Sequence, residues 1–333
     1  MVKSARFALA VLLAAAALPA AAQDTPTLRI YTYDSFAAEW GPGPALKSGF
    51  EATCGCTVEF IAADSSLGAL RRVQLEGEQT EADMILGLDT ATAGEARATG
   101  LFAPHGLVLD GLALPYEWTD PEFVPFDYGY FAFVYDTDLL APAPTSFEDL
   151  IAMPEDVKIV IQDPRSDTPG LGLVLWIKAL YGDRAAEIWQ GLKPHVLTVT
   201  RGWSEAYSLF LAGEADLVMS YTTSPAFHVF DAGDASYAAA DFGAHYTQVE
   251  VAGILESSDN QELARDFLRY LVSPEAQAVI PTTNWMYPVV DIGDALDPSF
   301  NDLMVPTEAL RADEAEVTAN KSAWIEEALA ALQ

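Results

Sequence analysis

The sequence predicts an α/β fold divided into two lobes. Short apolar segments rich in β-forming residues alternate with amphipathic helical segments, the pattern of strands and covering helices in α/β proteins. About 310 residues follow an N-terminal leader, which is more than one hydrophobic core usually serves. An extended, aromatic-rich segment at 126–135 separates two such sets, and we expect it to cross between the lobes.

Strands are expected where β-branched and aromatic residues form short apolar runs between turn residues. A polar loop over 33–44 follows the first strand, and a second loop, 87–89, is expected directly after the third. In open α/β sheets, ligands bind where such strand-end loops meet. The expected strands are 28–32, 57–62, 82–86, 126–135, 158–162 and 217–220.

Helices are expected where apolar residues recur at helical spacing behind a capping residue. Thr168 is expected to cap a helix that starts at Pro169, whose missing N–H costs nothing in the first turn. Ser204 and Ser273 are expected to cap two further helices. After Pro281 we expect irregular structure until a C-terminal helix. The expected helices are 47–52, 68–76, 169–181, 204–211, one from 225, 262–272, one from 274, and 323–332.

The N-terminus has the three parts of a secretory signal peptide. Lys3 and Arg6 provide positive charge, 7–18 is an apolar run, and small residues precede a cleavage point near Ala22. The run is shorter than the ~20 residues that span a bilayer as a helix. Its length therefore favours a signal peptide over the alternative, a short membrane anchor. We therefore expect a periplasmic protein that starts near Gln23.

The net charge of −32 excludes some classes of partner. An excess of carboxylates repels nucleic acid and anionic lipid and attracts cations. Solvation of the protein in a salty or alkaline habitat is the alternative explanation of this excess of negative charge. A cationic ligand would still be steered toward the protein, by an effect that fades as salt rises.

Cys54 and Cys56 are the two cysteines of the chain. An extracytoplasmic location permits a disulfide between them, and a free thiol pair is the alternative. Zinc is disfavoured because the four histidines are scattered along the sequence.

Several aromatic residues lie in loops at the ends of expected elements, where packing in the core is less automatic. A flat ligand held between such rings would explain them, and for a cation each ring face adds roughly 0.5–2 kcal/mol. Asp34 could supply a hydrogen-bonding carboxylate, whereas Trp176 and Trp189 lie inside helices and are expected in the core. The loop aromatics in question are Tyr33, Phe36, Trp40, Trp203, Tyr221, Trp285 and Tyr287.

Two polar segments, 64–66 and 166–168, precede expected helix starts. Free N–H groups at a helix N-terminus can hold an anion, although each segment alone also fits an ordinary cap. Asp167 would oppose a phosphate there unless its side chain turns aside.

No catalytic motif stands out in the sequence. His105, His195, His228 and His245 show no pairing with a nucleophile and an orienting acid. Phosphate-loop, zinc-protease and dinucleotide-binding patterns are also missing from the sequence. We expect a binding protein with no cofactor and no metal.

Seven segments spread along the chain carry a resemblance to a known family. They are YTYDSF (31–36), WGPGP (40–44), FVPFDYGY (123–130), QDPR (162–165), GWSEAY (202–207), SYTTSP (220–225) and NWMYP (284–288). These segments resemble those of the bacterial periplasmic thiamine-binding proteins, which are the receptors of thiamine ATP-binding-cassette (ABC) importers. The similarity covers nearly the whole chain after the leader, and the spacing of Cys54 and Cys56 also fits.

The resemblance implies a two-lobed periplasmic binding protein fold of type II, with a hinge and a ligand cleft between the lobes. Residues 23–126 with about 249–290 would form the N-terminal lobe, and 127–248 with about 291–333 the C-terminal lobe. The implied function is that of a monomeric receptor that captures thiamine, its monophosphate or its diphosphate and delivers it to the membrane permease subunits of the importer.

The resemblance also implies ligand-binding residues. Phe227 stands where the family can have Tyr, which keeps the ring and removes a hydroxyl. Asp167 stands where a smaller hydroxyl residue is expected, which puts tight binding of phosphorylated forms in doubt. The residues implied to line the pocket are Tyr33, Asp34, Trp40, Trp203, Tyr221, Phe227 and Trp285, and those implied at the phosphate end are Ser65, Ser66, Asp167 and Thr168.

Two other functions share this architecture. A thiaminase-like enzyme would need a cysteine nucleophile, but the two cysteines lie together in an expected surface loop away from the strand ends. A ferric-ion receptor typically uses two adjacent tyrosines, whereas the segment Tyr221-Thr222 contains one tyrosine.

Overall fold

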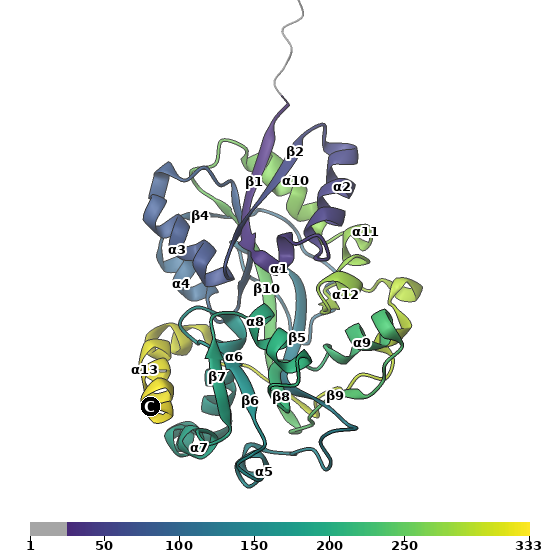
Figure 1. Cartoon of the computed structure of the whole chain (residues 1–333). Helices are drawn as coiled ribbons and strands as arrows, with labels where there is room; N and C mark the ends of the chain where they lie inside the picture. The colour runs from purple at the N-terminus through teal and green to yellow at the C-terminus, as the bar shows by residue number, and fades with distance from the viewer. Residues whose placement is uncertain (1–24) are drawn as a thin grey trace, which may run out of the picture.

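The computed structural model describes residues 25–333 and shows two lobes, one above the other in Figure 1. The expected signal peptide, 1–22, lies outside the described residues. The main strands follow the order β2-β1-β3-β10-β5-β8-β6-β7. Within residues 25–333, no helix has the length and apolar character that crossing a membrane requires.

The first lobe is built on β1, which pairs in parallel with β2 from Thr27↔Thr57 to Tyr33↔Ala63. Apolar side chains cover both faces of this sheet and form two clusters under the helices. Its strands are β1 (Thr27–Tyr33), β2 (Thr57–Ala63), β3 (Met84–Asp89) and β4 (Phe102–Ala103). Its helices are α1 (Asp34–Ala37), α2 (Gly43–Cys54), α3 (Ser66–Glu76), α4 (Ala93–Ala98), α10 (Gln261–Leu271), α11 (Pro274–Gln277) and α12 (Ile280–Thr283).

The second lobe has a core centred on Trp176, which is fully buried and packs its ring 4.9 Å from that of Phe147. Trp189 is buried in the same cluster, so both helical tryptophans are core residues as predicted. Its strands are β6 (Ile159–Gln162), β7 (Val196–Thr200), β8 (Leu217–Tyr221), β9 (Tyr237–Ala239) and β12 (Glu308–Leu310). Its helices are α5 (Phe147–Ile151), α6 (Thr168–Tyr181), α7 (Ala185–Leu192), α8 (Trp203–Leu211), α9 (Pro225–Ala232) and α13 (Glu314–Leu332).

Two long antiparallel strands, β5 (Phe123–Asp136) and β10 (Ala244–Leu255), connect the lobes (Figure 1). The first half of β5 pairs with β10, and its second half pairs with β8 of the second lobe. β10 in turn pairs with β3 of the first lobe. The aromatic-rich segment is therefore the predicted crossing, whereas β10 was not expected from the sequence.

Ionic contacts also join the lobes beside α4 and α13, which lie next to each other in Figure 1. Glu95 on α4 pairs with Lys321 on α13 and with Arg71 of α3. Arg97 on α4 lies 3.3 Å from a carboxylate oxygen of Glu314 at the start of α13. The last helix of the chain thus braces the first lobe as well as the second.

Several local predictions are wrong. Residues 87–89 continue β3 and do not form a loop, because Leu88 and Asp89 pair with Val251 and Glu250 of β10 past an irregularity at Gly87, whose φ is +99°. The loop 33–44 contains α1, the segment after Pro281 contains the short strand β12, and the last helix starts at Glu314. The disulfide expected between Cys54 and Cys56 is, by contrast, confirmed and lies where α2 ends.

Two predicted helix caps are displaced by one or two residues. α6 starts at Thr168, so Asp167 holds the N-cap position with extended backbone, but its side chain does not cap the helix. α8 starts at Trp203 behind the extended Gly202, which leaves Ser204 inside the helix. The cap at Ser273 is confirmed, since its hydroxyl accepts a hydrogen bond from the N–H of Ala276.

Candidate ligand-binding site

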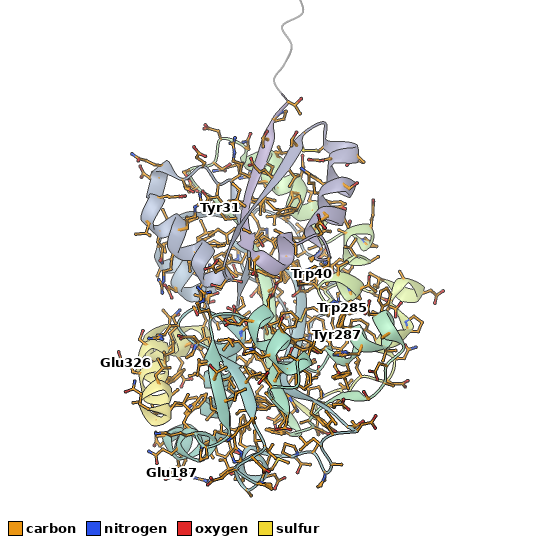
Figure 2. All side chains as sticks on the ribbon, in the orientation of Figure 1. Tyr31, Trp40, Glu187, Trp285, Tyr287 and Glu326 are labelled. Atoms are coloured by element: carbon orange, nitrogen blue, oxygen red, sulfur yellow. A yellow bond between two sulfur atoms is a disulfide. The ribbon has the colours of Figure 1, made fainter. Side chains whose placement is uncertain are left out.

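A cavity of about 300 Å³ lies between the two lobes. The first lobe contributes the end of β1, the start of α3 and the segment after α12, and the second lobe contributes the N-termini of α6 and α8 and the end of β8. Figure 2 shows Trp40 and Trp285 near the junction of the lobes. The predicted site residues that line the cavity are Tyr33, Asp34, Trp40, Ser65, Ser66, Asp167, Thr168, Trp203, Tyr221 and Trp285.

Phe227 does not line the cavity, unlike the other predicted residues. It lies on α9 with its ring 5.3 Å from that of Trp285, edge to face. The side chain of Phe227 extends from α9 toward Trp285 and packs against its ring. Phe227 therefore supports a residue of the cavity lining.

Trp285 has an unusual backbone conformation. Its φ is +57°, and it is the one non-glycine residue with positive φ among residues 25–333. Such a conformation costs of order 1–3 kcal/mol and persists where surrounding contacts impose it. Phe227 and Phe230 of α9 supply these contacts, with ring centroids 5.3 and 5.5 Å away. Trp285 follows α12 of the first lobe, so α9 of the second lobe fixes its indole at the cavity.

Trp203 is held in one orientation by two neighbours. Its indole N–H donates to the Ser220 hydroxyl at 2.8 Å, and its ring stacks on Tyr207 at 4.8 Å. Tyr207 is fixed in turn by a 2.8 Å hydrogen bond with His228. One face of Trp203 is thus covered by Tyr207, and the remaining ring surface is available to a ligand.

The floor of the cavity is a chain of hydrogen bonds that runs from one lobe to the other. The hydroxyl of Tyr33 donates to Glu250 at 2.8 Å, and the amide of Gln248 donates to the other oxygen of Glu250 at 2.9 Å. The hydroxyl of Tyr221 donates to Gln248 at 2.9 Å. Because Gln248 and Glu250 lie on β10, the crossing strand links a cavity residue of each lobe.

A second buried carboxylate, Asp127 on β5, lies behind this floor. The amide of Asn284 donates to Asp127 at 2.6 Å and to the Tyr33 hydroxyl at 3.1 Å. Burial raises the pKa of Asp127 to about 8, and burial with the neighbouring Asp127 charge raises the pKa of Glu250 well above its ordinary value. The floor therefore retains protons at neutral pH.

The cavity lining is strongly acidic. Burial, followed by the charge of Asp34, raises the pKa of Asp167 to about 8. Asp167 Oδ2 and Thr168 Oγ1 are buried and have no hydrogen-bond partner. Because buried polar atoms are normally paired, these two atoms of the cavity lining are available to bond a ligand. Arg201 is the one lysine or arginine of the lining, and the carboxylates of the lining are those of Asp34, Asp64, Asp167, Glu205 and Glu250.

Glu250, Asn284 and Arg201 line the cavity and were not expected from the sequence. A signal for Glu250 does exist, because it is a charged residue between Val249 and Val251 in an apolar run. Such a residue is almost never buried without a partner or a role. Asn284 and Arg201 have no comparable signal, since polar residues are ordinary in loops.

Comparisons with known proteins identify similar chains. The family model for bacterial extracellular solute-binding proteins matches residues 29–278. The thiamine-binding periplasmic protein of Escherichia coli strain K12 is 49% identical over 303 residues, covering 91% of this chain and 92% of its own. That of Brucella suis is 47% identical over 321 residues, covering 96% of each chain.

Among solved structures, a periplasmic thiamin binding protein matches with a TM-score of 0.91 and 47% identity, over 95% of this chain and 99% of its own. A ferric binding protein from Campylobacter jejuni matches with a TM-score of 0.75 at 19% identity, over 91% of this chain and 99% of its own, and this likeness concerns the fold alone.

Proposed function

Because the chain belongs to the family of bacterial extracellular solute-binding proteins, we propose that it is a periplasmic receptor that captures thiamine between its lobes. Relatives that carry this function in their names share nearly half of its residues over more than nine-tenths of its length. The observation that carries the proposal is the cavity itself, in which aromatic rings and carboxylates meet.

Thiamine fits these groups by its chemistry. It has a permanently charged thiazolium ring and a flat aminopyrimidine ring, and both can stack on indole and phenol faces. A cation over an aromatic face gains about 2 kcal/mol when desolvated. The acidic lining compensates the positive charge, and the unpaired oxygens of Asp167 and Thr168 can accept or donate hydrogen bonds.

The receptor would deliver thiamine to the permease subunits of an ABC importer. We propose that it acts as a monomer after removal of its signal peptide near Ala22. Its lobes, 23–126 with about 249–290 and 127–248 with about 291–333, would close about the crossing strands β5 and β10. Like its relatives, the chain is a receptor and not an enzyme. Moreover, the cysteines that a thiaminase-like reaction would need are joined in the Cys54–Cys56 disulfide.

Isothermal titration calorimetry with the mature protein tests this function. Thiamine is expected to bind at one site per chain. The matched control is the uncharged aminopyrimidine half of thiamine, 4-amino-5-hydroxymethyl-2-methylpyrimidine, which is expected to bind at least 100-fold more weakly because it lacks the cation. Absence of thiamine binding would refute the proposed function, and turnover of thiamine in the presence of a nucleophilic base would make the protein an enzyme.

A fluorescence titration provides a second test of the site. Trp203 and Trp285 line the cavity, so thiamine is expected to change tryptophan emission in proportion to the occupied sites. The change should persist in Trp324→Phe, because Trp324 lies on α13 among the core residues of the second lobe. Unchanged emission alongside calorimetric binding would mean that no tryptophan contacts the ligand.

The position of Tyr33 can be tested through Gly87. A Cβ atom at Gly87 would lie 2.4 Å from the Tyr33 ring, and its φ of +99° also disfavours other residues. Gly87→Ala is therefore expected to displace Tyr33 and weaken thiamine binding at least tenfold. Gly77→Ala is the control, because Gly77 also has positive φ but nothing within 4 Å of a new Cβ. Equal affinities of the two variants would show that Tyr33 does not contact thiamine.

A further inference from the structure

Asp167 occupies an unusual place at the meeting point of two helices. It precedes α6 in the N-cap position, but its side chain does not cap α6. Instead, its carboxylate lies beside the start of α8, since Asp167 Oδ1 is 3.8 Å from the position of a Cβ atom built at Gly202, the residue before that helix. The carboxylate thus lies at a helix N-terminus, where N–H groups could otherwise hold a bound anion.

The rest of this carboxylate is directed at the ligand space. Asp167 is 7% exposed and lines the cavity, and its Oδ2 atom has no partner. The adjacent Thr168 is 5% exposed, and its hydroxyl is also unpartnered. Two neighbouring side chains therefore present free hydrogen-bonding atoms to the same end of the cavity.

The electrostatic surroundings of Asp167 are also negative. The negative charges of Asp34, Asp163 and Asp89 each raise the pKa of Asp167, so each disfavours a further negative charge at this place. Arg201 alone provides a cationic side chain in the cavity lining. A phosphate ester carries about −1.5 to −2 charge at pH 7, so it would meet a carboxylate at the site where it needs N–H donors.

We propose that Asp167 makes this receptor selective for the unphosphorylated cation, because its carboxylate takes the place of a ligand phosphate at the N-terminus of α8. The thiamine cation favours the ionised form of Asp167. The hydroxyl of thiamine then donates a hydrogen bond to Asp167 Oδ2, whereas the phosphate groups of the monophosphate and diphosphate are repelled. The proposal rests on the proposed function, since it concerns which forms of thiamine enter the same cavity.

Calorimetric titration of the wild-type protein with thiamine and with thiamine monophosphate tests the selectivity directly. Thiamine is expected to bind at least tenfold more tightly than the monophosphate. A ratio below tenfold, with thiamine still bound, overturns this inference and leaves the proposed function intact. Failure to bind either compound instead refutes the proposed function.

Asp167→Ser then tests whether this residue is the cause. The variant is expected to bind the monophosphate more tightly than the wild type does, so that the ratio falls at least tenfold. Asp183→Ser removes one carboxylate just beyond the far end of α6, outside the cavity, and is expected to retain the wild-type ratio. An unchanged ratio in Asp167→Ser, in a variant whose circular dichroism matches the wild type, assigns the selectivity elsewhere. If this variant does not fold, Asp167→Asn, which keeps the shape and removes the charge, provides the same comparison.

Discussion

Replacing Trp203 with alanine is expected to weaken thiamine binding about 100-fold, which corresponds to about 2.7 kcal/mol. The indole is fixed by its hydrogen bond to Ser220 and by stacking on Tyr207, so it meets the ligand already oriented. Its loss removes a desolvated cation–π contact of about 2 kcal/mol and part of the apolar surface buried on binding. Calorimetry at constant salt measures the change.

The control for this prediction is Trp324→Ala. Trp324 packs on the core of the second lobe, and Lys178 lies over its ring at 5.9 Å, so its loss tests the removal of a tryptophan without a change in the cavity. Affinity is expected to stay within threefold of wild type in this control. If Trp203→Ala behaves like Trp324→Ala while remaining folded, Trp203 is not a stacking partner of thiamine.

The free energy of unfolding of the ligand-free protein is expected to fall as pH rises from about 6.5 to about 8. Burial raises the pKa of Asp127 and of Asp167 to about 8 in the folded protein, against an ordinary value of 3.8. Between these values the folded state keeps protons that the unfolded state has lost, so stability decreases with pH. The slope is about 1.4 kcal/mol per pH unit for each carboxyl that stays protonated.

Urea denaturation at several pH values measures this slope. Below about pH 6.5 the opposite trend enters, because burial lowers the pKa of His228 and His245, which then gain protons on unfolding. Carboxyls with lowered pKa, such as Glu95 beside Lys321 and Arg71, add to this trend at lower pH. Asp127→Asn is expected to flatten the slope above pH 6.5, since an amide does not titrate. A wild-type stability that stays level or rises between pH 6.5 and pH 8 would show that these carboxyls are ionised in the folded protein.

Bound thiamine should reduce the retention of a proton by Asp167. A cation in the cavity favours the ionised form of Asp167, so binding releases protons and affinity increases with pH below about 8. The acidic cavity thus links the vitamin's charge to the protonation of the site.

Much of the fold could be predicted from local patterns. Strands such as 28–32 and 57–62 are short apolar runs with clear ends, and Ser273 is a cap with a proline behind it, so each is fixed by nearby residues. β10 could not be found in this way. All but the first of its residues are buried, so it has no alternation of exposed and buried positions, and polar residues such as Gln248 and Glu250 interrupt its apolar character.

The site residues also divide into those that local sequence indicates and those that it does not. The aromatic residues at the ends of strands could be identified from the sequence, because large rings in loops need a reason to be there. Ser65, Ser66 and Thr168 were indicated by their place before expected helix starts, and the resemblance to a known family implied their role at the phosphate end. The partners that fix these residues depend on distances between remote segments: Tyr33 bonds to Glu250, which is 217 residues away, and Trp285 packs on Phe227 across the lobes. Neither distance follows from local sequence.

A crystal structure of the mature protein grown with thiamine tests the central claim most directly. We expect the vitamin in the cavity between the lobes, with its rings against Trp203 and Trp285 and its hydroxyl near Asp167. Thiamine bound at another surface, or an empty cavity in a protein that binds thiamine in solution, would contradict the account.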